Sequence, residues 1–579
     1  MSCPAPPPEP LATTASSVAG YDYGVRASGE AHGVVQTKPH IAQLLLELSG
    51  YTTARDLTRL RLLEPSCGQG TFLAQAVPRL LQVAQRLGCE PAQLGPCITA
   101  CDIEPEHVHH CQQRLATLLR NAGLPVAVTQ QLVTTWVQQG DFLLTELPSH
   151  FDVIVGNPPY VRLEQLTATL RTTYKKRYPS LQHRADLYIA FFERALSLLS
   201  PAGVLSFICA DRWTVNQYGA PLRRLIAQRF RLQCYLQLLA ASPFESQVAA
   251  YPSIVVLTPG QTTAVPVVTL QSASPEECAQ VLPSLHSHSQ PSGAGLKLEQ
   301  YEPWFVDAEP WVLSSPQQRL VLRQLESRFA PLTDSAQLGI GIATGNDSVY
   351  IVEAGCAIEP DRLVPLVMRE DLQPSSRRPP RFVINTFDTA GQPIDLRHHP
   401  LLQRYLSTHR PQLEQRYIAK KQPHAWFRTI DRLHPGLRAT PKLLIPDIAG
   451  ACEVSLDQGR YYPHHNLYFV TSKQWDLEVL GGLLSSRVAL FFVWSYAAKL
   501  RGGYLRFQAQ YLRRIRLPAP HSLDAGLAAQ LKQAFVARDF SRLDVLAQQA
   551  YGLAELPAFD FVDTRGRAAS RISDDPPTA

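Results

Sequence analysis

The stretch Phe151-Asp-Val-Ile-Val-Gly-Asn-Pro-Pro-Tyr160 decides how this chain is interpreted. Its first half is mostly apolar and β-branched, which is typical of a buried strand. The polar tetrapeptide Asn157-Pro158-Pro159-Tyr160 follows at the carboxyl end of that strand. In open α/β sheets, ligands bind beside the carboxyl ends of the strands. We therefore expect chemistry at residues 157–160.

The tetrapeptide fits the methylation of a planar, conjugated NH2 group, whose nitrogen lone pair is delocalised. The side-chain oxygen of Asn157 and the carbonyl of Pro158 can each accept one N–H of that group and so free the lone pair. Pro158 and Pro159 fix φ, which holds these carbonyls rigidly, and Tyr160 offers a flat face to a planar substrate. Asn-Pro is also an ordinary turn dipeptide, so a simple strand-ending turn stays open on these residues alone.

The overall composition is that of a globular protein. The chain has 579 residues, of which 45% are hydrophobic and 18% charged. It has no apolar run of the length, about 18 residues or more, that a membrane-spanning helix requires. Its first residues lack the features of a secretory signal, and its eleven cysteines form no CxxC pair. We expect a cytoplasmic protein with free thiols and no membrane segment.

Positive charge is concentrated in two stretches of the second half of the chain. Residues 401–440 contain eight Lys and Arg against two acids, and residues 499–516 contain six with no acid and three interleaved aromatic residues. Basic stretches mixed with aromatics are typical of nucleic-acid surfaces, although many charge runs are simply solvated faces. The candidate DNA-binding residues are Lys420, Lys421, Arg501, Arg506, Arg513 and Arg514.

The order of elements predicts an α/β first half. Residues 1–20 are rich in Pro, Ala, Ser and Thr and are expected to be disordered. Over residues 21–258, short β-branched runs alternate with helical periods, which is typical of βαβ units and a mostly parallel sheet. Strands are expected at residues 60–63, 98–101, 151–155, 204–208 and 253–257, and helices at 40–49, 72–87, 105–121, 185–200 and 219–229.

The second half has a different character. Residues 259–300 are rich in Thr, Ser, Pro and Gly, which predicts a linker. Residues 301–520 show β signals and glycine turns and are expected to form a second, mixed α+β unit. Residues 521–579 are expected to form a helical segment followed by a disordered tail.

A glycine turn follows the first expected strand. Leu62-Leu-Glu-Pro-Ser-Cys-Gly-Gln-Gly-Thr-Phe-Leu73 has the pattern of a strand, a turn and a helix start. Gly68 and Gly70 allow the backbone to approach a ligand closely, and the helix N-terminus favours a negative group. A nicotinamide-binding turn requires a third glycine where this chain has Leu73, which argues against a dehydrogenase.

Acidic residues stand at the next two strand ends. Asp102 is well placed to accept hydrogen bonds from ribose hydroxyls, and Asp141 with Phe142 could bind an adenine amino group and cover its ring. Each residue alone is equally compatible with a helix cap or a turn. Because these elements and residues 157–160 occupy consecutive strand ends, we interpret them together as a methyl-transfer site.

These motifs resemble those of the gamma class of N6-adenine DNA methyltransferases, which includes the TaqI-like and type IIG restriction–modification enzymes. The matching segments are Glu64-Pro-Ser-Cys-Gly-Gln-Gly70, Asp102-Ile103, Asp141-Phe142, Asn157-Pro-Pro-Tyr160, Ala185-Asp-Leu-Tyr188 and residues 201–208. Thr37 lies in a segment similar to the family's amino-terminal motif, with Lys38 where the family usually has Pro. Phe244 resembles the family aromatic that faces the tyrosine across a flipped base. Residues 339–345, 483–488 and 502–518 look like its target-recognition domain.

The resemblance implies a class I methyltransferase fold, with a mostly parallel, doubly wound sheet, followed by a mixed α+β target-recognition domain. It implies an adenine flipped out of double-stranded DNA, stacked between Tyr160 and Phe244 and bound through its amino group by Asn157 and Pro158, without a metal. A monomer and a separately encoded restriction endonuclease are also expected. The implied cofactor is S-adenosyl-L-methionine, and the implied cofactor-binding residues are Thr37, Glu64, Pro65, Ser66, Cys67, Gly68, Gly70, Asp102, Ile103, Asp141, Phe142 and Pro159.

Other functions stay open at this point. Methyltransferases of protein glutamine and of RNA guanine also carry Asn-Pro-Pro-Tyr but are usually compact, and N4-cytosine enzymes more often have Ser in place of Asn157. A fused nuclease is not expected, because the motifs begin at residue 33 and residues 446–455 lack the lysine of such a site. A non-catalytic DNA specificity subunit would need neither Asn157 nor Asp141.

A group of possible metal ligands lies between the second and third expected strands: Cys101, His107, His109, His110 and Cys111. No second ligand pair at a recognised spacing accompanies it, so a surface helix is favoured over a metal site.

Overall fold

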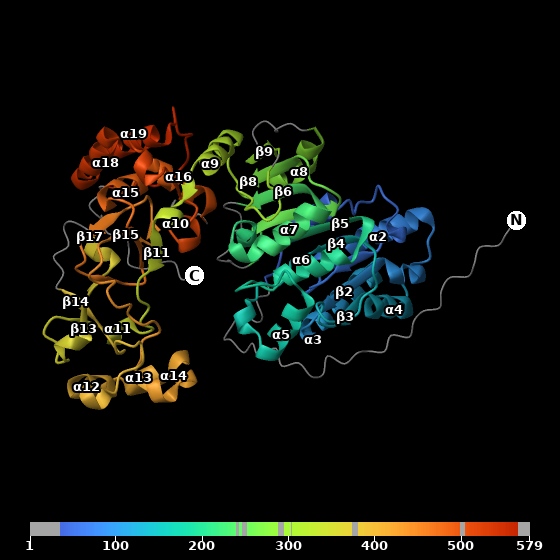
Figure 1. Ribbon diagram of the computed structural model, residues 1–579. Helices are drawn as coiled ribbons and strands as arrows, with labels where there is room; N and C mark the ends of the chain where they lie inside the picture. Colours follow the sequence, from blue (N-terminus) through green and yellow to red (C-terminus); the bar gives the residue numbers. More distant parts are fainter. Residues whose placement is uncertain are drawn as a thin grey trace. The chain divides into compact units, whose positions relative to one another are not determined.

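The computed structural model describes residues 35–238, 243–245, 252–287, 295–302, 304–372, 380–497 and 504–565. The chain divides into two compact units, residues 1–312 and residues 313–579 (Figure 1). The predictions of disorder for residues 1–20 and for the tail beyond residue 565 concern segments outside the described residues.

The first unit is built on a nine-stranded sheet with the order β3-β2-β1-β4-β5-β7-β6-β8-β9. Strands β3, β2, β1, β4 and β5 are parallel to one another, and β7 runs antiparallel between β5 and β6. The sheet is therefore mostly parallel, and the class I methyltransferase fold is confirmed. The strands are β1 (Leu62–Glu64), β2 (Ile98–Asp102), β3 (Val137–Gln139), β4 (Phe151–Gly156), β5 (Leu199–Ala210), β6 (Phe230–Leu238), β7 (Pro252–Pro259), β8 (Val265–Leu270) and β9 (Leu296–Tyr301).

Helices cover both faces of this sheet (Figure 1). One face carries α1 (Pro39–Leu48), α2 (Thr71–Leu87), α3 (Pro105–Asn121), α4 (Val126–Trp136) and α8 (Pro275–Ser287), whose buried side chains join one apolar cluster. Helices α6 (Tyr188–Ser197) and α7 (Ala220–Arg229) lie next to each other on the other face. Helix α5 (Ala168–Arg177) belongs to the segment between β4 and α6.

The predicted linker over residues 259–300 is wrong. Strand β8 pairs in parallel with β6, and β9 pairs antiparallel with β8, so both extend the sheet. The alternating burial along Val265–Leu270 is that of an ordinary strand, and the Ser- and Pro-rich composition belongs to the loops around it. The first unit also continues beyond residue 300, because Trp304 and Trp311 pack against Tyr235.

The second unit contains two four-stranded sheets, with the orders β11-β19-β15-β17 and β12-β14-β13-β18, and two short strand pairs, β10-β21 and β16-β20. This is the mixed α+β arrangement that was predicted. Its strands are β10 (Ala330–Pro331), β11 (Gln337–Ile340), β12 (Ile351–Glu353), β13 (Leu363–Val367), β14 (Arg381–Ile384), β15 (Lys442–Pro446), β16 (Ile448–Ala449), β17 (Ser455–Asp457), β18 (Tyr462–Pro463), β19 (Leu467–Thr471), β20 (Leu505–Arg506) and β21 (Arg516–Leu517).

The helices of the second unit are α9 (Pro316–Arg328), α10 (Leu332–Ser335), α11 (Asp347–Tyr350), α12 (Pro400–Thr408), α13 (Arg410–Glu414), α14 (Tyr417–Lys421), α15 (Leu477–Leu484), α16 (Arg487–Tyr496), α17 (Ala509–Leu512), α18 (Ala525–Ala537) and α19 (Phe540–Tyr551). The last two pack on α15. At Gly481 a Cβ atom would lie 2.5 Å from the Phe535 ring, so this close packing needs glycine.

Among the described residues, no single helix is long and apolar enough to cross a membrane. Helices α15 and α16 reach that length and composition only as a pair, and they meet at an angle of 56°. Most of their side chains are buried within the second unit.

Candidate active site

A pocket opens at the carboxyl ends of β1, β2, β3 and β4. From β1 the chain winds outward to β2 and β3, and on the other side of β1 it continues through β4 and β5. The loops after β1 and β4 therefore diverge and leave a crevice, as at the switch point of other doubly wound sheets. The predicted residues that line the pocket are Thr37, Glu64, Pro65, Ser66, Cys67, Gly68, Asp102, Ile103, Asp141, Phe142, Asn157, Pro158 and Pro159.

Three predicted residues do not line the pocket: Gly70, Tyr160 and Phe244. Gly70 is required for another reason, because its φ is 79° and a Cβ atom there would lie 2.6 Å from the Cys111 Sγ atom. Its role in this structure is to start α2 and to let α3 pack closely. Tyr160 and Phe244 lie beside the pocket residues and are described below.

The glycine turn is held by a carboxylate. Gly68 donates its backbone N–H to Asp102 Oδ2 at 2.8 Å, and Glu104 donates its N–H to Asp102 Oδ1 at 3.0 Å. His107 Nδ1 lies 3.2 Å from the same Oδ1 atom, and this hydrogen bond raises the pKa of His107. Asp102 thus ties the loop after β1 to the end of β2, at the wall of the pocket.

Glu64 is a buried carboxyl group at the end of β1. Only 1% of the residue is exposed, and its Oε2 atom has no hydrogen-bond partner among the described residues. Burial raises the pKa of Glu64 well above its ordinary value, with Cys111 and Asp102 adding to the shift. A buried, unpartnered carboxyl group favours a ligand that carries a positive charge or N–H groups.

A hydrogen-bonded pair forms the opposite wall. Tyr174 of α5 donates its hydroxyl to Asp141 Oδ2 at 2.7 Å, and Leu143 donates its N–H to Asp141 Oδ1 at 2.8 Å. The Phe142 ring packs on Phe191 with the centroids 5.0 Å apart. Tyr174 and Phe191 were not predicted from the sequence as site residues. The spacing of Leu170, Tyr174 and Tyr178 could have indicated that Tyr174 faces inward, because it places three apolar residues on one face of a helix.

The side chain of Asn157 is oriented by its own amide. Its Nδ2 group donates to the Val35 carbonyl at 2.9 Å and to Thr37 Oγ1 at 3.3 Å. Because a backbone carbonyl can only accept, this contact fixes which end of the amide is the oxygen. The Oδ1 atom is buried and has no partner within the described part of the chain. Asn157 therefore presents one free, preoriented acceptor beside Pro158.

Tyr160 and Phe244 are brought into contact, although 83 intervening positions separate them in the chain as printed. Their ring centroids are 6.2 Å apart and their planes meet at 80°. Phe244 is held by backbone pairing with Thr37, and Lys38 donates its N–H to the Pro243 carbonyl at 2.9 Å. The predicted partners therefore meet edge to face and leave no parallel-sided slot between their rings in this arrangement.

The ring of Tyr160 also lies near Tyr188, whose hydroxyl belongs to a hydrogen-bond network. The Tyr188 ring lies 6.2 Å from the Tyr160 ring. Tyr188 donates its hydroxyl to Asp186 Oδ2 at 3.0 Å, and its hydroxyl oxygen is 2.7 Å from that of Tyr218. Asp186 and Tyr188 belong to residues 185–188, which resemble a motif of the family, whereas Tyr218 was not predicted as a site residue.

Asp211 is a further acidic residue at this edge of the sheet. It directly follows β5, and burial raises its pKa to about 7. Burial also raises the pKa of Tyr160, and the charges of Cys209 and Asp211 add to that effect. Asp211 was not predicted as a site residue, because the strand expected at residues 204–208 ends three positions before it, whereas the observed β5 continues to Ala210.

Two families match this chain. Residues 97–244 match the Eco57I restriction-modification methylase family, and residues 401–517 match the TaqI-like C-terminal specificity domain. The chain is 40% identical over 532 residues to the type II methyltransferase M.PaeR7I of Pseudomonas aeruginosa, covering 91% of this chain and 92% of the relative. It is 39% identical over 543 residues to the type II methyltransferase M.BstVI of Geobacillus stearothermophilus, covering 90% and 96%.

The chain belongs to the type II methyltransferases of restriction–modification systems. Its fold is also that of the solved type IIL restriction–modification enzyme MmeI in complex with DNA, with a TM-score of 0.58 and 12% sequence identity. That similarity covers 89% of this chain and 74% of MmeI. The cofactor of the methyltransferase is S-adenosyl-L-methionine, and DNA is its partner.

The pocket fits that cofactor. The unpartnered Oε2 atom of Glu64 suits the cationic amino-acid end of S-adenosyl-L-methionine. Asp102, with lone pairs left on its carboxylate, suits ribose hydroxyls. Phe142 and Asp141, at the other end of the pocket, suit an adenine ring and its amino group.

Of the six predicted DNA-binding residues, three are exposed, two contact neighbouring side chains, and one lies outside the described residues. Lys420 and Lys421 are exposed on α14, and Arg513 is exposed after α17. Arg506 donates to Asp447 Oδ2 at 2.9 Å, and the Arg514 guanidinium lies 4.9 Å from the Tyr496 ring centroid. Arg501 lies outside the described residues.

Two of the three aromatic residues interleaved with the cations of residues 499–516 lie in the core and not at the surface. Phe507 is fully buried and Tyr511 is 5% exposed, so both belong to the core of the second unit. Arg416, in the other basic stretch, donates to the Tyr350 hydroxyl and to the Trp426 carbonyl, both at 2.8 Å. Part of the basic and aromatic pattern therefore reflects internal packing and not a surface for bases.

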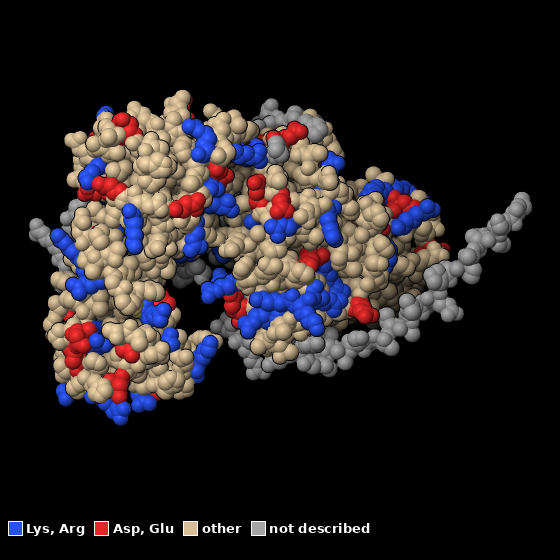
Figure 2. All heavy atoms as spheres, viewed as in Figure 1, with Lys and Arg blue, Asp and Glu red and all other residues tan. Residues whose placement is uncertain are grey.

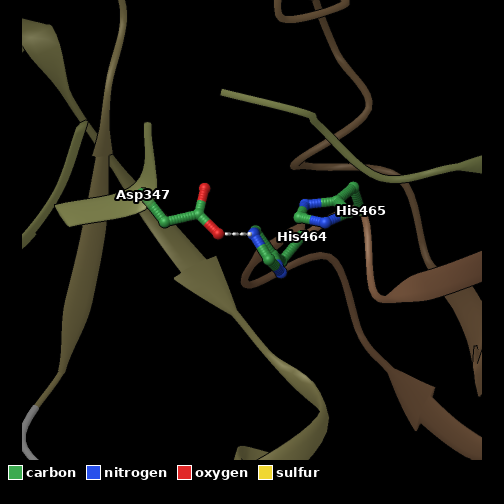
Figure 3. A group of neighbouring side chains, drawn as sticks. All are labelled: Asp347, His464 and His465. Atoms are coloured by element: carbon green, nitrogen blue, oxygen red, sulfur yellow. Dashed lines mark hydrogen bonds and ion pairs between the residues drawn. The ribbon is translucent and has the colours of Figure 1, made fainter. Parts of the chain in front are cut away.

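Within the described residues, one group of side chains has the spacing of metal ligands: Asp347, His464 and His465 (Figure 3). Their ligand atoms lie within 4.8 Å of one another. His464 Nε2 is 3.0 Å from Asp347 Oδ2, and this hydrogen bond lowers the pKa of Asp347 to about 2. The pair joins α11 to the loop before β19. In the group of possible ligands found in the sequence at residues 101–111, His107 instead contacts Asp102.

Proposed function

We propose that this type II methyltransferase transfers a methyl group to the N6 amino group of an adenine flipped out of double-stranded DNA. The observation that carries the proposal is the free Oδ1 atom of Asn157, which is buried, preoriented by Val35 and Thr37, and located at the pocket. A buried acceptor without a donor is costly, and an amino group of the substrate would satisfy it. An aromatic ring system carrying such a group also fits the neighbouring Tyr160 and Phe244.

The residues would act on the amino group as follows. S-adenosyl-L-methionine supplies a methyl carbon that its sulfonium makes electrophilic. Asn157 Oδ1 and the Pro158 carbonyl each accept one N–H, which draws the nitrogen towards a tetrahedral shape and frees its lone pair. The nitrogen forms its bond to carbon as the carbon–sulfur bond breaks, and the now acidic nitrogen then loses one proton. Holding the reactants in line can contribute several kcal/mol to such a step.

Base flipping would be supported by the aromatic pair. Extruding a base from a duplex costs a few kcal/mol, and stacking on an aromatic side chain returns roughly 1–3 kcal/mol per base. Because Tyr160 and Phe244 meet edge to face, one ring must turn to admit the base. Holding the base there would place its amino group beside Asn157.

We assign methyl transfer to the first unit and recognition of the DNA sequence to the second. The methylase family matches within the first unit, and the specificity-domain family matches within the second. We also propose that the protein acts as a monomer in the cytoplasm, beside a separately encoded restriction endonuclease.

The test is to incubate the purified protein with unmethylated DNA and isotopically labelled donor and then to identify the labelled nucleoside. N6-methyladenine at a consistent sequence is the expected product, mapped by single-molecule sequencing. Label on cytosine, or on protein or RNA only, would overturn the proposal. Asn157→Ala serves as the negative control.

A further inference from the structure

Positive charge gathers on a segment of the first unit that lies within the methylase family match but between the motifs at residues 157–160 and 185–188. Residues 162–184 contain six Lys and Arg, namely Arg162, Arg171, Lys175, Lys176, Arg177 and Arg184, against the single acid Glu164. The segment therefore carries a charge of +5 (six minus one), while the net charge of the whole chain is only +6. Figure 2 shows Lys and Arg gathered over α5 with little acid among them.

The charge of these cations is largely uncompensated by described acidic residues. Lys175 and Lys176 are exposed and form no ion pair with a described residue. Arg184 contacts Glu164 at 3.5 Å, but both side chains are well exposed, which makes the pair weak. Arg177 donates to the Leu144 carbonyl at 3.2 Å, which leaves its charge uncompensated.

Helix stability explains only part of this pattern. Cations in the last turn interact favourably with the helix dipole, which accounts for Lys175, Lys176 and Arg177. Arg171 and Lys175, however, are a like-charged pair four positions apart, which destabilises a helix. Arg162 and Arg184 lie outside the helix altogether. The accumulated charge therefore points to an anionic partner.

The position of the segment suggests which partner. The inner side of α5 presents Tyr174 to the pocket, where it donates to Asp141, and Leu166 lines the same pocket. An α-helix with its side chains is only about 10–12 Å across, so the basic outer side lies close to the pocket wall. A flipped nucleotide stays joined to its duplex by two phosphodiesters, which brings a row of phosphates to the rim of such a pocket.

We propose that the exposed surface of residues 162–184, here called the α5 basic surface, binds the phosphate backbone of duplex DNA. The inference rests on the proposed function, in which the first unit receives a nucleotide from a duplex. The contact is independent of sequence and is supplied by the methyltransferase unit, in addition to the contacts of the specificity domain. Lys175 and Lys176 are its central residues because neither has another partner among the described residues.

The experiment compares two double variants that remove the same charge. Lys175→Ala/Lys176→Ala alters the α5 basic surface, and alanine is a strong helix former, so the fold is retained. Arg229→Ala/Arg231→Ala is the matched control. These exposed residues stand at the amino end of β6, on the opposite edge of the same sheet. Binding of an unmethylated duplex, without donor, is followed by fluorescence anisotropy from about 50 to 200 mM salt, a range in which phosphate contacts dominate the change.

Each phosphate contact contributes about 0.9 to the slope of log affinity against log salt concentration. We expect Lys175→Ala/Lys176→Ala to lower that slope by about 2, equally for duplexes of any sequence. The control variant is expected to keep the wild-type slope. Equal slopes for all three proteins would overturn the proposal, as would a structured RNA that binds more tightly than the duplex with the same dependence on these lysines.

A charge-reversal variant, Lys175→Glu/Lys176→Glu, sharpens the test and is expected to weaken binding further. Thermal unfolding of each variant shows whether the fold is retained. The proposed reaction is judged separately, by the identity of the methylated nucleoside. A product other than N6-methyladenine would overturn the proposed function and leave the salt slope informative about the α5 basic surface.

Discussion

The rings of Tyr160 and Phe244 meet edge to face, with centroids 6.2 Å apart and planes at 80°. The main chain of Phe244 is fixed by pairing with Thr37, and Tyr160 follows the rigid Pro158-Pro159 pair. Ring rotation, and not backbone movement, is therefore the simplest way to admit a planar base between them.

Phe244→Leu is expected to weaken capture of the target base by about 1–3 kcal/mol, the value of one stacking contact, because leucine fills the site but cannot stack. Once the target site is mapped, fluorescence of a duplex carrying 2-aminopurine at that position measures base extrusion. Phe244→Tyr keeps an aromatic ring and is expected to extrude the base normally. Equal fluorescence for the leucine variant and the wild type would show that Phe244 does not hold the base.

Asn157→Ala is expected to lower the single-turnover rate of methyl transfer by at least about 10²-fold, the usual cost of removing one preoriented group at a reacting centre. Donor affinity, measured by calorimetry, should change little, because the Asn157 side chain contacts Val35 and Thr37 and leaves Oδ1 for the substrate. Thr37→Ser retains the hydroxyl and serves as the control. A parallel loss of donor affinity in Asn157→Ala would assign the residue to the cofactor instead.

Glu64→Gln is expected to raise the unfolding temperature at neutral pH while weakening binding of the cofactor. Burial raises the pKa of Glu64 well above its ordinary value of 4.5, so the folded protein retains a proton that the unfolded chain releases. The stability linked to Glu64 is therefore complete below pH 4.5 and declines as the pH rises towards the folded-state pKa. Glutamine removes this dependence, so the variant should unfold at a higher temperature than the wild type at neutral pH.

The same Glu64→Gln variant should bind S-adenosyl-L-methionine more weakly, because glutamine cannot ionise when the cationic end of the donor binds, and a hydrogen bond to a charged group contributes about 1.5–3 kcal/mol. Unfolding midpoints across pH and calorimetric affinities test the two effects independently. A variant that unfolds at a lower temperature and still binds the donor normally would contradict the assignment.

Lys442→Met is expected to destabilise the second unit by about 3–5 kcal/mol, the usual cost of leaving one member of a buried ion pair alone. Lys442 Nζ lies 2.6 Å from Asp457 Oδ2, with side-chain exposures of 0% and 5%. Lys442→Met/Asp457→Asn removes the uncompensated charge but keeps a hydrogen-bonding side chain for the turn at Arg460, so it should recover part of the loss. Chemical unfolding of both variants, with methyl transfer as a check of the first unit, measures the difference.

Local patterns in the chain were sufficient for the framework of the first unit. Each of the five expected strands overlaps an observed one, because buried strands form short, nearly continuous apolar runs that stand out from their surroundings. Glu64, Asp102 and Asn157 stand at the carboxyl ends of three of them, Asp141 follows β3, which was not among the expected strands, and a parallel sheet brings such ends to one edge. The shared pocket could therefore be predicted from their order alone.

Segments whose structure is decided by contacts with distant parts of the chain could not be predicted from local patterns. Strands β8 and β9 lie in a stretch with a loop-like composition, and pairing with β6 decides their structure. Phe507 and Tyr511 have the same local context as surface aromatics, yet the core of the second unit buries them. Tyr174 reaches Asp141 only because α5 folds back over the loop after β3.

The chain's local order thus specifies the reaction chemistry, because a methyl-transfer site at a sheet edge needs particular residues directly after particular strands. The contacts between those residues depend on long-range packing. Val35 and Thr37 orient Asn157 and leave its oxygen free, and Thr37 also pairs with Phe244, which brings that ring to Tyr160. Such contacts join segments far apart in the sequence, and only closure of the fold offsets the entropy lost in bringing them together.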